Sequence, residues 1–310
     1  MSVATRDMGA SIRAGQAALL KNAFLIAGPT ASGKSGYALN LAQQTGGVII
    51  NADSMQVYSV LSVITARPQA EELAAAPHRL YGHVHPSAPY STGAWLRDVA
   101  DLVRSGDLAG KPAIFVGGTG LYFRALTQGL APMPDIPDPV RKAWRKRLEM
   151  EGAETLHRLL AERDPQSASR IEPGDGQRIV RALEVLESSG EPIGAWQARK
   201  GQPLVDLASA QLTVLEPDRK VLHGRIAFRF DQMIRRGALQ EVRALLSLGL
   251  SPAMPSMKAI GVRELGSYLA GEQQLSVAVE QAIAATRQYA KRQSTWFRHQ
   301  LDERWKRVRI

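Results

Sequence analysis

Short hydrophobic runs alternate with amphipathic stretches between residues 22 and 130. The runs in AFLIA (23–27), GGVIINADS (46–54) and KPAIFVGGTG (111–120) are typical of buried strands that end in small or polar residues. TGAWLRDVADLVRSG (92–106) instead has helical periodicity. This order of elements predicts a parallel β-sheet with helices on both faces, and such sheets bind ligands at the carboxyl ends of their strands.

The pattern changes at a cluster of four prolines within residues 132–139. The chain that follows is charged and helical, with no strand signal before QLTVLEP (211–217). We therefore expect a helical insertion at 137–206 and a core made of 22–136 and 207–310, helical from about residue 216 to its end. Residues 1–21 are expected to be a flexible extension.

Composition narrows the class of protein. The chain has 310 residues, no cysteine, and 39 Lys and Arg against 29 Asp and Glu, a formal charge of +10. Without cysteine there is no disulfide, no Cys-based zinc site and no thiol nucleophile. The basic surplus indicates a polyanionic partner such as nucleic acid, or simply a solvated basic surface. No apolar run is long enough to span a membrane, so we expect a cytoplasmic protein.

GPTASGKS fits the phosphate-loop pattern G-x-x-x-x-G-K-[ST] at every fixed position. In such a loop the backbone N–H groups and the following helix attract phosphate oxygens, the lysine reaches a terminal phosphate, and the last hydroxyl binds Mg²⁺. An ATPase, a kinase and an enzyme that expels diphosphate could all use it. The candidate phosphate-binding residues are Gly28, Pro29, Thr30, Ala31, Ser32, Gly33, Lys34 and Ser35, the last also being the candidate Mg²⁺ ligand.

Two polar residues follow the next two strands. Asp53 could contact magnesium or act as a general base, or it could merely cap a helix that begins near Ser54. Thr119, in the turn GGTG, could offer a hydroxyl to an anion or a base, or the turn could serve packing alone. Three nearby histidines, His78, His83 and His85, lack a helical ligand spacing and are interpreted as loop residues.

Basic side chains recur on two predicted helices. Arg225 and Arg229 are four residues apart and could clamp a diphosphate opposite the loop lysine, although such a pair also suits a solvated face. Further on, ATRQYAKRQSTWFRHQ (285–300) interleaves basic and aromatic residues. That pattern suits an RNA backbone and unstacked bases, or an ordinary amphipathic terminal helix.

Together these motifs resemble the tRNA dimethylallyltransferase family, the isopentenyl-tRNA transferases. The resemblance covers about residues 22–300, with its segments in family order. They are GPTASGKS (28–35), NADSMQVY (51–58), AAPHRLYGHVHP (75–86), VGGTGLYFRAL (116–126), DGQRIVRALEV (175–185), RIAFRF (225–230), MKAIGVREL (257–265) and TRQYAKRQSTWFR (286–298).

The resemblance implies a P-loop NTPase-like α/β core with a helical insertion that grips the tRNA anticodon stem-loop. The implied reaction moves a dimethylallyl group from dimethylallyl diphosphate to the N6 amine of the adenosine 3′ of the anticodon, with Mg²⁺ as cofactor and a monomeric enzyme. Asp53, Thr119 and Arg229 would be catalytic, and Arg225 would assist in diphosphate binding. The implied tRNA contacts are Asp53, Ser54, Met55, Gln56, Thr119, Arg141, Gln177, Arg178, Ile179, Val180, Arg181, Lys258, Arg263, Arg287, Lys291, Arg292, Trp296 and Arg298.

One segment departs from the family pattern. VLSVITARP (60–68) stands where the family has a Gly-containing stretch ending in GTAKP, with Arg67 in place of the lysine and Ile64 at the glycine position. Three other functions stay open from the residues alone: a small-molecule P-loop kinase, a prenyltransferase acting on free adenine nucleotide, and an RNA-binding protein without catalysis. The basic helix and the insertion weigh against the first two, and the intact phosphate loop weighs against the third.

Overall fold

The computed structural model describes residues 19–108 and 110–310. The predicted extension 1–21 lies largely outside this range. The described chain divides into two compact units, one formed by the residues up to Thr127 together with Leu204–Ile310, and the other by Gln128–Pro203. The sequence placed the insertion at 137–206, so the compact helical unit begins and ends somewhat earlier along the chain.

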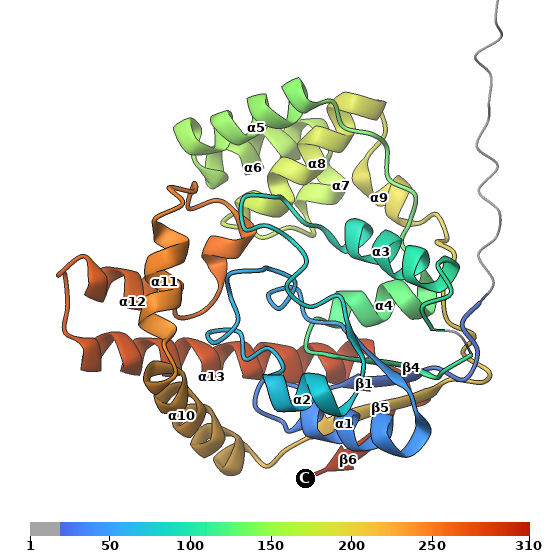
Figure 1. Ribbon diagram of the computed structural model, residues 1–310. Coiled ribbons are helices and arrows are strands. Elements are labelled where there is room, and N and C mark those ends of the chain that lie inside the picture. The colour runs from blue at the N-terminus through green and yellow to red at the C-terminus, as the bar shows by residue number, and fades with distance from the viewer. Residues whose placement is uncertain (1–18, 109) are drawn as a thin grey trace, which may run out of the picture. The chain divides into compact units, whose positions relative to one another are not determined.

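A six-stranded sheet forms the centre of the first unit within the described residues, in the order β3-β2-β4-β1-β5-β6 (Figure 1). All neighbouring strands run parallel, which confirms the predicted class of sheet. The strands are β1 (Phe24–Ala27), β2 (Val48–Asn51), β3 (His78–Arg79), β4 (Ala113–Gly117), β5 (Gln211–Glu216) and β6 (Lys306–Arg309).

Helices cover both faces of this sheet (Figure 1). On one face α1 packs over Ile26, Ile49 and Ile114, and on the other α3, α4 and α13 pack over Leu25 and Phe115. The period-2 alternation of the strands therefore divides one sheet between two apolar cores. The helices of this unit are α1 (Lys34–Thr45), α2 (Ala70–Ala75), α3 (Thr92–Arg104), α4 (Gly120–Gln128), α10 (Arg219–Arg235), α11 (Ala238–Leu246), α12 (Val262–Leu269) and α13 (Leu275–Gln300).

A further apolar cluster lies beside the sheet. It joins α10, α11, α12 and the first half of α13 to the segment 57–64, through buried side chains such as Leu61, Phe230, Val242 and Leu265. Because α13 belongs both to this cluster and to the sheet core through Phe297, one long helix connects the two halves of the unit. Its residues therefore pass directly by the carboxyl ends of the strands.

The helical unit has its own core around Trp144, Leu156, Leu160 and Leu183. The first and last residues of this unit lie close together. A side chain at Gly129, whose φ is +75°, would place its Cβ only 2.4 Å from the backbone nitrogen of Gln202. Its helices are α5 (Asp138–Glu151), α6 (Ala153–Arg163), α7 (Pro165–Ala168), α8 (Gly176–Ser189) and α9 (Ile193–Gln197).

Two short strands were not predicted. The expectation of helix from about residue 216 to the end is wrong at β6, and His78, expected in a loop, begins β3. Neither sequence, His-Arg or Lys-Arg-Val-Arg, has an apolar face. The backbone of β6 pairs with β5 instead, and the buried side chains of Leu301 and Trp305 anchor the segment just before it.

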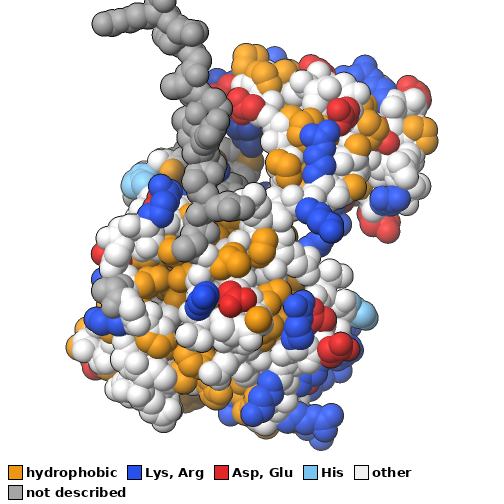
Figure 2. Space-filling view, turned by 90° about the vertical axis from the view of Figure 1, so that its right-hand side faces the viewer, with side chains coloured by type: hydrophobic (Ala, Val, Ile, Leu, Met, Phe, Trp, Pro, Cys, Tyr) orange, Lys and Arg blue, Asp and Glu red, His pale blue; other side chains and the backbone are white. Residues whose placement is uncertain are grey.

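The two units differ in charge. Residues 128–203 hold 12 Lys and Arg and 12 Asp and Glu, so the whole surplus of positive charge lies elsewhere in the chain. On the face drawn in Figure 2, acidic and basic side chains are interspersed over the helical unit. Among the described residues, no helix is both long and apolar enough to cross a bilayer.

Candidate active site

The loop between β1 and α1 has the backbone conformation of an anion-binding turn. Ala31 and Gly33 have positive φ angles of 62° and 82°, and such alternation turns successive N–H groups toward one side. Gly28 has no room for a side chain, since a Cβ there would lie 2.7 Å from the Ser32 hydroxyl. That hydroxyl is buried and has no hydrogen-bond partner among the described residues.

Lys34 folds back over this loop, and its Nζ donates a hydrogen bond to the carbonyl of Pro29 at 3.1 Å. The pKa of Lys34 is lowered to about 8, mainly by burial. The negative charge of Asp53 opposes this shift, whereas the positive charge of Arg229 contributes to it. The ammonium is therefore charged at neutral pH but weakly solvated. A cation in this state gains more than an exposed one from an anionic ligand.

Asp53 sits in a tight turn just beyond β2. Asn51 fixes the turn, because its side-chain oxygen accepts from the Asp53 N–H at 2.8 Å and its amide donates to the Asp53 carbonyl at 2.9 Å. One carboxylate oxygen of Asp53 accepts from the N–H of Met55 at 2.9 Å. No helix begins at Ser54, so the alternative of a helix cap is wrong, and the hydrogen bond is an Asx turn.

Thr119 supports this turn from the neighbouring strand. Its hydroxyl accepts from the Ser54 N–H at 2.9 Å and donates to the Ser54 hydroxyl at 3.3 Å. The side chain does not line the cavity that Asp53 faces. Thr119, predicted to be catalytic, is placed where it orients the Asp53 turn through Ser54.

Three glycines between the end of β4 and the start of α4 give room to neighbouring groups. Added Cβ atoms would lie 2.0 Å from the carbonyl oxygen of Ala52 at Gly117, 2.1 Å from Gln293 at Gly118, and 2.2 Å from Trp296 at Gly120. The motif VGGTG therefore lets α13 and the end of β2 approach the backbone of this turn closely.

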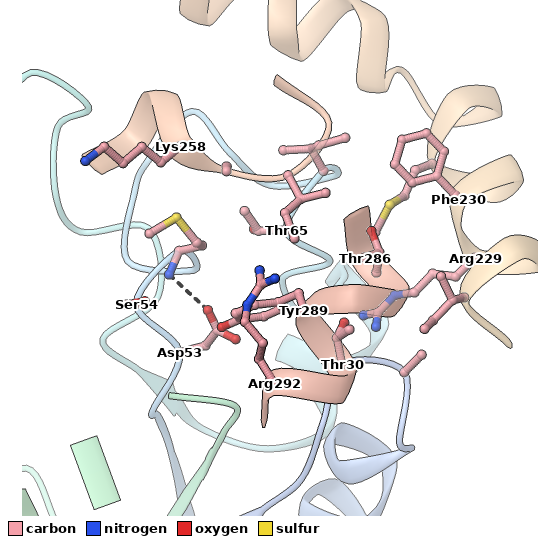
Figure 3. Close-up of a pocket in the computed structure, with 17 residues that line it drawn as sticks. Thr30, Asp53, Ser54, Thr65, Arg229, Phe230, Lys258, Thr286, Tyr289 and Arg292 are labelled. Carbon is pink, nitrogen blue, oxygen red and sulfur yellow. Dashed lines mark hydrogen bonds between the residues drawn. The ribbon is translucent and has the colours of Figure 1, made fainter. Parts of the chain in front are cut away.

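The Asp53 turn and the phosphate loop open onto one cavity of about 310 Å³. Figure 3 shows Asp53, Tyr289 and Arg292 around the same space, with Thr30 and Arg229 nearby. The lining combines polar and charged side chains with an apolar part of the wall that includes Ile64, Phe230 and Ile260. The lining residues are Thr30, Ala31, Asp53, Ser54, Met55, Ile64, Thr65, Ile226, Arg229, Phe230, Met233, Lys258, Ala259, Ile260, Thr286, Tyr289 and Arg292.

Arg229 also lines a second, smaller cavity of about 170 Å³ that reaches Ser35. Burial lowers the pKa of Arg229, and the nearby charges of Asp53 and Glu72 oppose the shift. Arg67 and Arg236 line this second cavity too. Arg225 is exposed on the same helix, with a guanidinium nitrogen 4.0 Å from the position of a Gly33 Cβ, so both predicted arginines of α10 lie beside the phosphate loop.

The basic and aromatic residues of α13 do not all lie on one free surface. A groove of about 540 Å³ is lined by residues that include Lys291, Arg292 and Trp296, and Arg298 is exposed nearby. Arg287 is only half-exposed, and its Nε is buried without a hydrogen-bond partner among the described residues. Of the two predicted residues of the 257–265 segment, Lys258 lines the main cavity, whereas the side chain of Arg263 is 88% exposed.

In the helical unit, the predicted tRNA contacts separate into two groups. Gln177, Arg178 and Arg181 line a cavity of about 570 Å³. Arg141 is partly exposed and forms an ion pair with Asp138 at 3.5 Å. Ile179 and Val180 are buried in the core of the unit instead. On α8 these two apolar residues point away from the cavity, so their side chains are not available to RNA.

Several residues that shape the cavity were missed by sequence reasoning. Thr286, Tyr289 and Gln293 lie at i, i+3 and i+7 on α13, which places them on one helix face. Gln293 is 5% exposed, and burial together with Asp53 raises the pKa of the Tyr289 hydroxyl. This spacing is a usable signal in the sequence, although basic residues such as Lys291 and Arg292 are interleaved with it.

Among the described residues, no group of three or more His, Cys, Asp and Glu could hold a metal ion. Magnesium bound to phosphates keeps several waters and needs few protein ligands. The exposed Ser35 at the start of α1, at the rim of the arginine-lined cavity, fits such a hydroxyl ligand.

A phosphate loop, a carboxylate and two cationic side chains surround a partly apolar cavity in an α/β fold of the P-loop type, and the comparisons that follow assign the chain to the transferases. The chain belongs to the IPP transferase family, whose model matches residues 56–300. A second model, isopentenyl transferase, matches residues 21–84.

Relatives and solved structures agree with this assignment. The chain is 64% identical over 292 residues to the tRNA dimethylallyltransferase of Chelativorans sp. (strain BNC1), covering 94% of this chain and all of that one. It is 59% identical to the tRNA dimethylallyltransferase of Mesorhizobium japonicum, covering 94% and 90%.

Among solved structures, the fold is similar to the tRNA isopentenylpyrophosphate transferase of Bacillus halodurans, with a TM-score of 0.64, 31% identity and coverage of 93% and 90%. It is also similar to a eukaryotic dimethylallyltransferase acting on tRNA, with a TM-score of 0.72, 29% identity and coverage of 89% and 70%.

Proposed function

We propose that this protein transfers a dimethylallyl group from dimethylallyl diphosphate to tRNA, at the N6 amine of the adenosine 3′ of the anticodon, and releases diphosphate. The observation that carries the proposal is the cavity that Asp53, the phosphate loop and Arg229 share with an apolar wall. A diphosphate with a short hydrocarbon chain needs both kinds of surface.

The reaction breaks the bond between the allylic carbon and the diphosphate oxygen and forms a bond between that carbon and the amine nitrogen. Negative charge grows on the leaving diphosphate, where Lys34, Arg229 and the free N–H groups of the phosphate loop would stabilise it. Magnesium held at Ser35 would supply further positive charge to the phosphate oxygens.

The adenine amine must also lose a proton, and we assign its acceptance to Asp53. Its Asx turn to Met55 occupies one carboxylate oxygen, while the other lies 3.5 Å from the position of a Gly118 Cβ, beside the cavity. A carboxylate held in this way is oriented before the substrate arrives, which is what general-base catalysis requires.

An adenine stacked in an anticodon loop cannot enter a cavity, so the base has to be drawn out of the stack. The groove on α13, with Lys291 and Trp296, combines positive charge with an aromatic surface. The cavity of the helical unit adds Arg170, Arg178 and Arg181. We assign both surfaces to the sugar-phosphate backbone and the unstacked bases of the tRNA.

The test is to incubate the protein and Mg²⁺ with labelled dimethylallyl diphosphate and to offer tRNA, AMP or ADP as acceptor. We expect label in tRNA only, on N6 of the adenosine 3′ of the anticodon when nucleosides are analysed by mass spectrometry. Label in AMP or ADP would indicate an enzyme for free nucleotides. Phosphate transfer from ATP, with no prenyl transfer, would indicate a kinase.

A further inference from the structure

Residues 61–67 form a compact loop that lines both cavities of the active site. Ile64 and Thr65 belong to the wall of the main cavity, whereas Val63, Ala66 and Arg67 line the cavity that reaches Ser35. The loop contains neither a helix nor a strand, so hydrogen bonds and packing must hold it. Its conformation sets the shape of the space around the substrate.

Consecutive backbone N–H groups of this loop converge on one carboxylate. Glu241, on α11, accepts from the N–H of Ser62 at 2.5 Å and of Val63 at 2.7 Å through one oxygen, and from the N–H of Ile64 at 2.7 Å through the other. The residues are about 180 positions apart in the chain. Glu241 therefore fastens the loop to a helix that does not itself line the cavities.

The other side of the loop is held by its carbonyl groups. The side-chain amide of Gln56 donates to the carbonyls of Thr65 and Ala66 at 2.8 and 3.0 Å, and Arg67 donates to Tyr58 and Ser59. These partners all precede the loop by about ten residues or fewer. Apolar packing of Leu61 and Ile64 also joins the loop to α10–α13, and Glu241 adds hydrogen bonds from a distant part of the chain to this packing.

A carboxylate suits this position for a physical reason. Three N–H groups from successive residues form a concavity with partial positive charge, which favours an anion. Bonds to an ionised acceptor are also about twice as strong as neutral ones. An amide in place of the carboxylate would keep one acceptor oxygen and turn an NH₂ group toward one of the donors.

We propose that Glu241 is a positioning residue for donor binding: it fixes residues 62–64 so that Ile64 and Thr65 form the wall against which the prenyl group lies. This assignment rests on the proposed transfer from dimethylallyl diphosphate. Contacts with the hydrocarbon exist both before and during transfer, so weakening them impairs binding of the donor more than it slows the bound complex.

The experiment measures the KM for dimethylallyl diphosphate, kcat and tRNA affinity in Glu241→Gln, with Glu280→Gln as matched control. Glu280 is an exposed carboxylate on α13 that does not line the cavities. We expect Glu241→Gln to raise the donor KM about tenfold or more, with kcat within about threefold and tRNA affinity unchanged. Glu280→Gln is expected to match the parent protein.

Glu241→Asp tests for rescue, because it keeps the negative charge on a shorter side chain. Its KM for the donor should lie between those of Glu241→Gln and the parent protein. A folded Glu241→Gln protein with the parent KM, even one with a lower melting temperature, would reduce Glu241 to a structural residue and overturn the assignment. If the parent protein transfers no prenyl group to tRNA, the proposed function fails first. These two failures are distinguished by the parent reaction alone.

Discussion

The side-chain oxygen of Gln293 accepts a hydrogen bond from the backbone N–H of Thr30 at 2.9 Å. The amide nitrogen of the same side chain donates to the carbonyl of Gly118, also at 2.9 Å. One buried amide on α13 thus joins the phosphate loop after β1 to the turn after β4. The relative position of these two segments, and of Asp53 between them, depends on a residue that carries no charge.

Replacing Gln293 by Glu tests this bridge with almost no change in shape. The new carboxylate can still accept from Thr30, but it cannot donate to Gly118 and would repel that carbonyl. We expect a loss of stability of about 1–3 kcal/mol and a decrease in transfer rate of about tenfold or more. Thermal melting and single-turnover transfer measure the two effects.

The matched control is Gln281→Glu, at an exposed position of the same helix. It makes the same chemical change without touching the two loops, and we expect it to behave like the parent protein. Equal activity in both variants would mean that the bridge does not position the site.

The charge of Lys34 predicts how donor binding varies with pH. Its pKa of about 8 in the free protein means that the ammonium is present below pH 8 and lost above it. A diphosphate binds the charged form more tightly, so the affinity for dimethylallyl diphosphate should fall above pH 8, by up to about tenfold per pH unit. Binding titrations at constant ionic strength, from about one and a half pH units below this pKa to about as far above it, measure the dependence.

Lys34→Arg is the control for this dependence, because a guanidinium stays charged throughout that range. Its donor affinity should not vary around pH 8, whatever its absolute value. A parent protein whose affinity is flat across this range would show that Lys34 does not contact the diphosphate.

The variant Asp53→Asn separates the role of Asp53 as general base from its role in forming the turn. Asparagine can keep the hydrogen bond to the Met55 N–H but cannot accept the amine proton. We expect the transfer rate to fall by about 10²–10⁴, with tRNA affinity and melting temperature close to those of the parent. Single-turnover transfer beside a binding titration makes the measurement. A folded Asn variant that transfers within about threefold of the parent rate would exclude Asp53 as the base.

The groove on α13 predicts a change in salt dependence. Lys291→Ala and Arg298→Ala together should weaken tRNA binding and reduce the slope of log affinity against log salt by about two, because each cation that neutralises a phosphate adds about one to the slope. Arg287 is left out because its guanidinium is partly buried. Arg219→Ala, on an exposed residue of α10, should leave the slope unchanged, and an unchanged slope in the double variant would exclude the groove.

The parts of the site that the sequence predicted are those that local rules determine. The phosphate loop, the position of Asp53 just after β2 and the Gly-rich turn after β4 each depend on residues within about eight positions of one another, so a short motif is enough to reveal them. The strands β1, β2, β4 and β5 were also predicted, because their buried positions must be apolar.

The missed parts depend on partners far away in the chain. Gln293 reaches Thr30 across 263 positions, and Glu241 reaches Ser62 across 179. In the sequence each is one polar residue on an amphipathic helix, with nothing to indicate its partner. The strand β6 was missed for a similar reason, because it pairs with β5 through its backbone and through the ion pair of Arg307 with Glu216, and not through an apolar face of its own.

The close approach of Gly129 to Gln202 has a consequence for how the chain assembles. The ends of the helical unit lie close together, and just outside it the carbonyl of Leu126 accepts from the N–H groups of Leu204 and Val205. For the strands of the sheet, the stretch from 128 to 203 therefore acts as a short connection. Once these helices have formed, β5 can pair with β1 without the loop-closure entropy of the 76 free residues from 128 to 203. The unit is in this sense a self-contained module, which a chain could gain or exchange without rearranging the order of its strands.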